Sequence, residues 1–453
     1  MPLWDLLKSA LEKHSVHTIS EKNASMSFYE MSLFAETFAE TLTESCYGIL
    51  CQSELATSMA ILSCLAAHVT AVPLSMRYGE QHYRKIVDHI KMPAIITDIG
   101  GEIHCVNINT GEYQSPQDPI SLIMCTSGST GHPKGVMLTE KNISTNLEDI
   151  CHYFHITESD TILIERPLYH CAVLNGEFFA AIIQGANIRF CSDAFNPKNI
   201  IHEIESFHIT TMCGTPTIFS LLNHMGSFPC NLPLEKIVLS GEPLPENTAR
   251  RIRKMLPDTE IYHVYGLTEA SPRVSYLPPQ LFDLYPTSIG FPLRSEKVAI
   301  VDQEDHLLLP GQVGELVVRG ENVMLGYYGD NEYTNTTLKG GWLHTGDMGY
   351  KTPNGLYYIK GRKDNMIIRA GMNIYPQEIE NALLSDSRVE DVIVYTEKHD
   401  QSQKIKMLIK GNFAQTQEVR HLCIDLLPSY AIPNEIEITR CIPHNASGKK
   451  LLS

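Results

Sequence analysis

The stretch that decides the fold is Ile120-Ser-Leu-Ile-Met-Cys-Thr-Ser-Gly-Ser-Thr-Gly-His-Pro-Lys-Gly-Val136. It begins as an apolar strand and runs into a loop of hydroxyl side chains and glycines. Glycine permits the backbone angles and close approach that turn several N–H groups onto phosphate oxygens. The hydroxyls add donors and Lys134 adds charge, so the stretch predicts a phosphate-binding loop. Its expected contacts are Thr126, Ser127, Gly128, Ser129, Thr130 and Lys134.

On both sides of this loop, short β-branched strands alternate with stretches of helical length. Pro93–Asp98 and Lys236–Leu239 are typical of the strands, and Glu54–Ala67 and Glu140–His152 of the helices. This alternation predicts an α/β fold, a sheet covered by helices. From about Val298, closely spaced strands with glycine-rich turns replace it, which predicts a smaller β-rich subdomain.

The C-terminal part differs again. It begins after Gly361-Arg-Lys-Asp364 and has one expected helix, Gln377–Leu384. Its expected strands are Asp391–Tyr395, Lys404–Lys410 and Glu435–Thr439. We therefore predict a large N-terminal α/β domain over residues 1–363 and a small α+β C-terminal domain over residues 364–453.

The composition limits the class of protein. The chain has 453 residues, of which 43% are hydrophobic and 19% charged, as in soluble globular proteins. A net charge of -16 opposes nonspecific binding to phosphate backbones, so no nucleic-acid partner is expected.

No apolar run reaches the roughly 18 residues of a membrane span, and we expect no secretory signal. The 12 cysteines are scattered without a C-x-x-C pair, which favours reduced thiols in the cytoplasm over a zinc site.

The phosphate loop lacks the Gly-Lys-Ser/Thr ending of a Walker loop. It closely resembles the signature of the AMP-forming adenylating superfamily, which includes acyl-CoA synthetases, peptide-synthetase adenylation domains and luciferases. The resemblance extends from about residue 26 to the end of the chain. Its further motifs, in order, are Tyr265-Gly-Leu-Thr-Glu269, Thr345-Gly-Asp347, Gly361-Arg-Lys-Asp364, Leu427-Pro-Ser-Tyr430 and Ser447-Gly-Lys449. It implies that ATP and a carboxylic acid form an acyl-AMP, from which the acyl group passes to a thiol.

The resemblance also implies roles for individual residues. Glu269 is expected to orient Mg²⁺, since hard carboxylate oxygens suit this ion, and Thr268 to donate to the α-phosphate. Asp347 is expected to accept hydrogen bonds from the ribose, and Arg362 to reach the ribose or the phosphates. Lys449 is the expected catalytic lysine, because a mobile charge can bridge the carboxylate and the α-phosphate.

Other positions match the adenine site and the moving parts of the family. The residues expected around adenine are Gly241, Glu242, Pro243, His263 and Tyr265, with Tyr265 stacking on the ring. In this family the small domain is mobile and rotates about a hinge residue, which Asp364 matches. After the rotation, Gly371 would give the backbone room to line a tunnel for a phosphopantetheine arm.

The identity of the acid depends on two neighbouring residues. His170 falls where many acyl-CoA synthetases carry a histidine beside the substrate carboxylate. Peptide synthetases place an aspartate near the next position to pair with an α-amino group, whereas Cys171 is only a weak donor and acceptor. Because an unpaired buried ammonium is costly, we expect an aliphatic acid with an uncharged tail.

Alternatives stay open for the acceptor thiol and for the class of protein. Coenzyme A and a carrier-protein phosphopantetheine share one reactive arm, and coenzyme A is favoured because carrier proteins are commonly acidic, like this chain. A free-standing enzyme that loads an amino or aryl acid onto an acyl or peptidyl carrier protein stays open. So does a luciferase-like oxygenase, which no residue favours. An inactive nucleotide-binding scaffold would be expected to have lost the charged residues named above, and they are all present.

Overall fold

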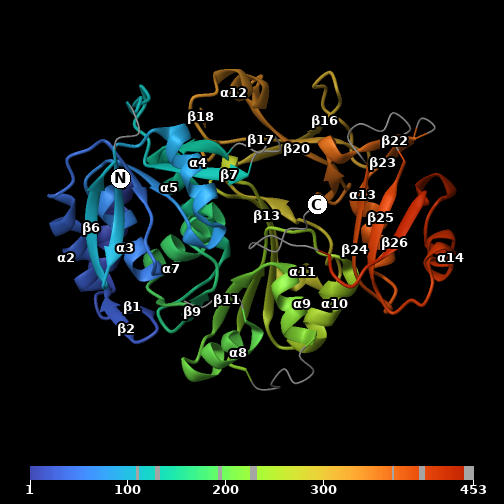
Figure 1. Cartoon of the computed structure of the whole chain (residues 1–453), viewed down its shortest axis with the longest axis horizontal. Coiled ribbons are helices and arrows are strands. Elements are labelled where there is room, and N and C mark those ends of the chain that lie inside the picture. The colour runs from blue at the N-terminus through green and yellow to red at the C-terminus, as the bar shows by residue number, and fades with distance from the viewer. Residues whose placement is uncertain are drawn as a thin grey trace.

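The computed structural model describes residues 1–108, 112–127, 133–191, 196–224, 232–369, 372–396 and 404–442. Figure 1 shows the N-terminal elements in blue at one end, the β-rich section along one long edge and the C-terminal elements in red at the other end. Among the residues that the structure describes, no helix combines the length and the hydropathy that crossing a membrane requires.

A seven-stranded sheet holds the strands of the predicted phosphate loop. Its order is β18-β8-β7-β4-β3-β5-β6. The strands are β3 (Cys46–Ile49), β4 (Thr70–Pro73), β5 (Ala94–Ile99), β6 (Glu102–Asn107), β7 (Leu122–Ser127), β8 (Pro133–Leu138) and β18 (Gly326–Tyr327). β7 and β8 pair antiparallel with Thr126 opposite Lys134, so the loop joins the two strands of a hairpin.

A nine-stranded sheet has the order β15-β14-β13-β12-β11-β9-β10-β1-β2. The strands are β1 (Thr18–Glu21), β2 (Ala24–Ser27), β9 (Thr161–Ile164), β10 (Asn187–Phe190), β11 (Thr211–Gly214), β12 (Lys236–Leu239), β13 (Glu260–Gly266), β14 (Arg273–Leu277) and β15 (Phe291–Pro292). The run from β13 to β1 is parallel. Its inner strands β9, β10, β11 and β12 are almost wholly buried, as strands with both faces covered must be.

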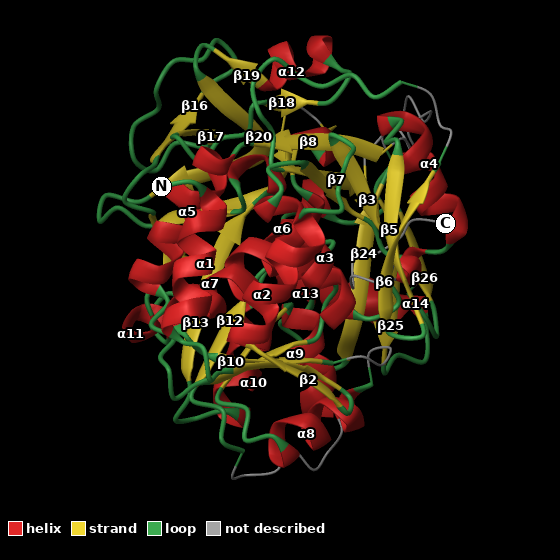
Figure 2. Ribbon diagram, turned by 90° about the vertical axis from the view of Figure 1, so that its left-hand side faces the viewer, coloured by secondary structure: helices red, strands yellow, loops and turns green. Residues whose placement is uncertain are grey.

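Helices fill the space between and around these sheets, and Figure 2 shows them gathered in the middle of the molecule. They are α1 (Leu3–Lys13), α2 (Phe28–Ala39), α3 (Glu54–Ala66), α4 (Glu80–Ile90), α5 (Glu140–Tyr153), α6 (Cys171–Val173), a π-helical segment (Leu174–Phe179), α7 (Ala180–Gln184), α8 (Pro197–Ser206), α9 (Pro216–His224), α10 (Glu246–Met255) and α11 (Pro279–Phe282). α3 contacts both sheets, and the main hydrophobic core surrounds it. α5 begins with a capping box in which the side chains of Thr139 and Asn142 each accept from the other's backbone N–H.

The β-rich section is a five-stranded sheet of order β16-β17-β20-β19, with β21 also paired to β20. Its elements are β16 (Lys297–Val301), β17 (Gly314–Arg319), α12 (Asn331–Thr337), β19 (Leu338–Lys339), β20 (Trp342–Lys351) and β21 (Tyr357–Arg362). The predicted α/β architecture with a β-rich section is thereby confirmed.

The described residues of the C-terminal part form two small sheets and two helices, and their buried apolar side chains, from Ile367 to Ala431, make a separate hydrophobic cluster. The elements are β22 (Ile367–Arg369), β23 (Met372–Ile374), α13 (Pro376–Leu383), β24 (Val389–Tyr395), β25 (Lys406–Gly411), α14 (Thr416–Leu426) and β26 (Glu435–Ile438). The sequence analysis missed α14. Gln415 before it makes no side-chain cap, so the usual signal of a helix start is missing there.

Candidate active site

The predicted phosphate loop begins where β7 ends and finishes where β8 begins. Thr126 and Ser127 end β7, and Gly128, Ser129 and Thr130 lie outside the described residues. The ammonium of Lys134 lies 3.2 Å from the ring centre of Tyr333 and 5.6 Å from that of Tyr327. Both distances are within the range of a cation–π interaction, so two tyrosines hold this charge beside the loop.

Glu269 contacts one of these tyrosines, Tyr327. It sits with Thr268 in a 3₁₀ turn, η3 (Thr268–Ala270), directly after β13. The Tyr327 hydroxyl donates to Glu269 Oε1 at 2.7 Å, and the Tyr327 and Tyr333 rings are 4.9 Å apart. Burial, followed by the Glu269 carboxylate, raises the pKa of Tyr327, so the phenol stays a donor. The structure thus brings Glu269 and Lys134 together through two tyrosines that the sequence analysis did not single out.

Asp347 has two partners that are distant in sequence. The Tyr265 hydroxyl donates to Asp347 Oδ2 at 2.6 Å. Arg362, opposite Asp347 in the β20–β21 ladder, donates to Oδ1 at 3.4 Å and to the Thr345 carbonyl at 2.7 Å. Gly346 has a φ of +72°, and a Cβ there would lie 2.8 Å from Arg362 Nη2. The positive φ favours glycine, and the missing Cβ leaves room for the Arg362 guanidinium beside the turn.

Burial raises the pKa of the Asp347 carboxyl, and the Arg362 charge and the Tyr265 hydrogen bond only partly oppose this. Donors from a ribose would therefore stabilise its charged form further. Tyr265, Asp347 and Arg362 form one contact group, which brings the residue expected at the adenine ring next to the two expected at the ribose.

The predicted adenine residues lie beside this group. Leu239 of β12 is opposite His263 of β13, so residues 240–243 leave the sheet next to Tyr265. Gly241 turns with a φ of +84°, and Glu242 accepts from the N–H and hydroxyl of Thr217 at 3.2 and 2.6 Å. Pro243 is exposed.

Two buried polar atoms test whether a nucleotide base suits this place. Ser240 Oγ and His263 Nδ1 are buried and have no hydrogen-bond partner among the described residues. Burial lowers the pKa of His263 to about 4, so the ring is neutral near pH 7. A base edge with donors and acceptors fits such atoms, because buried polar groups are normally hydrogen-bonded.

His170 and Cys171 lie at the start of α6. Burial, then the charges of Arg166 and Arg77, lowers the pKa of His170 to about 3, so its imidazole is neutral. Burial raises the pKa of Cys171 to about 12, which keeps it a thiol. Beside them is a buried ion cluster that the sequence analysis missed: Arg166 donates to Glu177 at 2.6 Å. The adjacent opposite charges Glu165-Arg166, directly after an apolar strand, were its available signal.

The remaining predicted residues concern the hinge and the lysine. Asp364 lies in η4 (Lys363–Asn365), with Oδ2 3.7 Å from Arg362 Nη2. Gly371 and Lys449 lie outside the described residues, so their roles stay predictions.

Comparison with known proteins now decides the family. The family model described as AMP-binding enzyme matches residues 7–328. The chain belongs to the AMP-binding enzyme family. The long-chain-fatty-acid–CoA ligase of Salmonella typhimurium is 29% identical over 84% of this chain and 69% of its own length. Feruloyl-CoA synthase of an Amycolatopsis species is 30% identical over 78% of the chain and 72% of its own length.

The fold of this chain is also similar to that of a solved coenzyme A synthetase. O-succinylbenzoate coenzyme A synthetase from Bacillus subtilis, in complex with AMP, aligns with a TM-score of 0.85 at 25% identity. The alignment covers 100% of this chain and 97% of that one. The predictions of the AMP-binding enzyme family, of the fold class and of an AMP-forming acid–thiol ligase are confirmed.

Proposed function

We propose that this protein is an AMP-forming acid–coenzyme A ligase that uses ATP and Mg²⁺. A substrate carboxylate oxygen attacks the α-phosphate of ATP, the bond to the β-phosphate oxygen breaks, and pyrophosphate leaves. The thiol of coenzyme A then attacks the acyl carbon, a proton leaves the sulfur, and AMP departs as the thioester forms.

One observation carries the proposal: the stretch from Tyr265 to Glu269 contacts Asp347 at one end and Tyr327, which lies beside Lys134, at the other. A nucleotide laid along this stretch would have its ribose at Asp347 and its phosphates at Lys134 and Glu269. A metal ion there would neutralise phosphate charge, and carboxylate oxygen is the donor that Mg²⁺ prefers.

The residues on the chain meet the needs of the first half-reaction. Bringing a carboxylate to a triphosphate sets two anions against each other, so donors and cations must be in place beforehand. We assign this role to Lys134, Thr126, Ser127, Thr268 and the hydroxyl loop, and later to Lys449. The relative from Bacillus subtilis has been solved in complex with ATP and a magnesium ion, which supports the choice of cofactors.

For the second half-reaction we propose two domains, 1–363 and 364–453, that turn about Asp364. The separate hydrophobic cluster of residues 367–431 supports this division. The rotation would remove Lys449 from the acyl-AMP and bring Gly371 to the thiol path. This part of the proposal follows the family pattern.

We propose an aliphatic acid with an uncharged tail, in line with Cys171. The relatives named above are ligases of long-chain fatty acids and of aromatic acids, so an aryl acid is the second candidate. A carrier protein as acceptor and a cytoplasmic location also stay predictions. Every described cysteine is a free thiol, which agrees with the latter.

The test is acid-dependent release of pyrophosphate across fatty, aryl and amino acids, followed by transfer to coenzyme A or to a phosphopantetheinylated carrier protein. We expect pyrophosphate, AMP and an acyl-CoA in equal amounts with an aliphatic acid. If no acid of any class stimulates the release of pyrophosphate, the proposal is refuted.

A further inference from the structure

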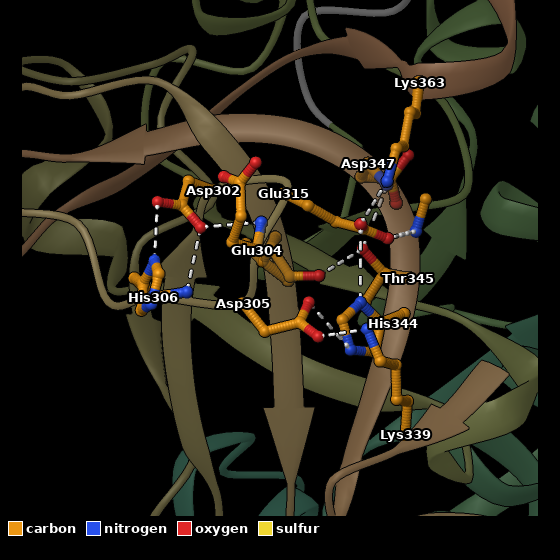
Figure 3. A network of polar contacts seen from close by, with 12 residues as sticks. Asp302, Glu304, Asp305, His306, Glu315, Lys339, His344, Thr345, Asp347 and Lys363 are labelled. Carbon is orange, nitrogen blue, oxygen red and sulfur yellow. Dashed lines mark hydrogen bonds and ion pairs between the residues drawn. The ribbon is translucent and has the colours of Figure 1, made fainter. Parts of the chain in front are cut away.

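A buried carboxylate next to the site has no role so far. Glu315 lies in β17, directly after Gly314, and its side chain is buried. Figure 3 shows it reached by dashed lines from β20 and from Lys363. It accepts from the Gly346 N–H at 3.1 Å and from Lys363 Nζ at 2.8 Å, and its Oε2 lies 3.4 Å from His344 Nδ1. One buried group therefore joins two segments that are distant in sequence.

The first segment is the turn that presents Asp347. Glu315 holds the Gly346 N–H, and the carbonyl of the next residue, Leu316, accepts from Thr345 Oγ1 at 2.8 Å. The same Thr345 Oγ1 accepts from the Asp347 N–H at 3.0 Å. Two consecutive residues of β17 thus fix three consecutive residues of β20, and with them the direction of the Asp347 carboxylate.

The second segment is the residue before the hinge. Lys363 precedes Asp364, and its ammonium ends on Glu315, within the β-rich section of the large part of the chain. A rotation at residue 364 needs the backbone on its N-terminal side to stay fixed. The ion pair supplies that anchor, because a charge-assisted hydrogen bond to a buried carboxylate is among the stronger polar contacts.

We propose that Glu315 is a positioning residue that aims the ribose-binding carboxylate of Asp347 and anchors the fixed side of the hinge through Lys363. The inference rests on the proposed function and deepens it, because it assigns one residue to both half-reactions. Glu315 touches neither substrate, and it acts through the Gly346 N–H and the Lys363 ammonium.

The same network offers a matched control. Lys339 pairs with Asp305, and His344 Nε2 lies 3.8 Å from Asp305 Oδ1. Lys339 is exposed, and its ion pair is with Asp305 rather than with Glu315. Lys339→Met therefore removes a lysine from the network without touching either segment.

The experiment compares Glu315→Gln, Lys363→Met and Lys339→Met. ATP affinity is measured by calorimetry, thioester formation by single turnover from supplied acyl-AMP, and folding by the melting temperature. We expect Glu315→Gln to weaken ATP binding about tenfold and to slow thioester formation about as much, since a charged hydrogen bond is lost at each segment. Lys363→Met should change ATP affinity less than about twofold and still slow thioester formation. Lys339→Met should change neither.

A purely structural role would lower the melting temperature of Glu315→Gln and leave ATP affinity and the rate of thioester formation unchanged, which would overturn the proposal. If Glu315→Gln does not fold, Lys363→Met decides: an unchanged thioester step overturns the hinge anchor. Calorimetry with ATP needs no acid substrate. A wild-type protein that binds ATP and activates no acid would therefore refute the proposed function alone.

Discussion

The hydroxyl of Tyr265 donates a 2.6 Å hydrogen bond to the carboxylate of Asp347, across two different sheets. Tyr265 lies in β13 of the nine-stranded sheet, and Asp347 lies in β20 of the five-stranded one. The bond therefore links the two sheets at the candidate site. It also holds the carboxylate oxygen beside the segment 240–243, where the base is expected.

Asp347→Asn should weaken ATP binding by about ten- to hundredfold, because each hydrogen bond to a charged group contributes about 1.5–3 kcal/mol. Tyr265→Phe should weaken it by less than about tenfold, since the carboxylate remains. Calorimetry with ATP measures both. Tyr262→Phe is the control, because it removes a tyrosine–carboxylate bond to Glu260 on the same strand. Equal losses in all three variants would contradict the assignment.

Glu269→Gln should raise the Mg²⁺ concentration needed for half-maximal pyrophosphate release by about tenfold or more, since an amide oxygen is a weaker ligand than a carboxylate. Tyr327→Phe should raise it less, because it removes only the hydrogen bond that orients the carboxylate. Glu321→Gln, which removes an exposed carboxylate paired with Lys141, should leave it unchanged. An Mg²⁺ requirement that is the same in Glu269→Gln would place the ion elsewhere.

Lys449→Ala should slow acyl-AMP formation about a hundredfold and leave thiol attack on supplied acyl-AMP nearly intact. Losing one preorganised charge costs about 3 kcal/mol of transition-state stabilisation. The two half-reactions are measured separately, by pyrophosphate release and by thioester formation. Lys450→Ala is the control. If Lys450→Ala slows acyl-AMP formation and Lys449→Ala does not, Lys450 is the catalytic lysine.

Aliphatic acids should release pyrophosphate far better than α-amino acids with the same side chain. An ammonium entering an apolar pocket loses hydration that Cys171 cannot replace, whereas one more methylene gains only about 0.8 kcal/mol. Cys171→Asp should erode this preference by burying an unpaired carboxylate. A wild-type preference for an amino acid would refute the aliphatic assignment, and Glu177 or Glu242 would then be examined as its anchor.

The buried pair of Asp160 and Lys236 should make stability depend on pH. Burial raises the pKa of Asp160, but the hydrogen bonds from Lys236, Thr210 and Thr157 outweigh this and hold it below its usual value of 3.8. A lowered folded-state pKa means that the stabilisation is present above the unfolded pKa. It is lost as pH falls through the folded pKa.

Asp160→Asn should therefore destabilise the protein by about 3 kcal/mol at pH 7, because it leaves Lys236 buried without its charge partner. The difference in melting temperature from the wild type should shrink as the pH falls below about 4. Glu36→Gln, which removes the surface partner of Lys8, should show little change at either pH. A difference that stays constant down to pH 3 would contradict this account.

The sequence alone determined the family, the fold class and several of the helices and strands. The loop around Thr126 to Lys134 needs its glycines, hydroxyls and lysine in one order, because backbone donors and charge must converge on phosphate. One strand of the parallel run, Lys236–Leu239, was readable as a short apolar segment between polar residues. Local signals of this kind depend only on neighbouring residues.

The tertiary structure decided which distant residues meet. Tyr327 orients Glu269, Tyr333 lies under Lys134, and Glu315 joins the Asp347 turn to Lys363. Nothing in the spacing of these residues predicts the contacts, because each contact joins elements that are separate in sequence and meet only in the folded chain. A sequence pattern records the period of one element, whereas the partner of a buried side chain depends on how several elements are placed in space.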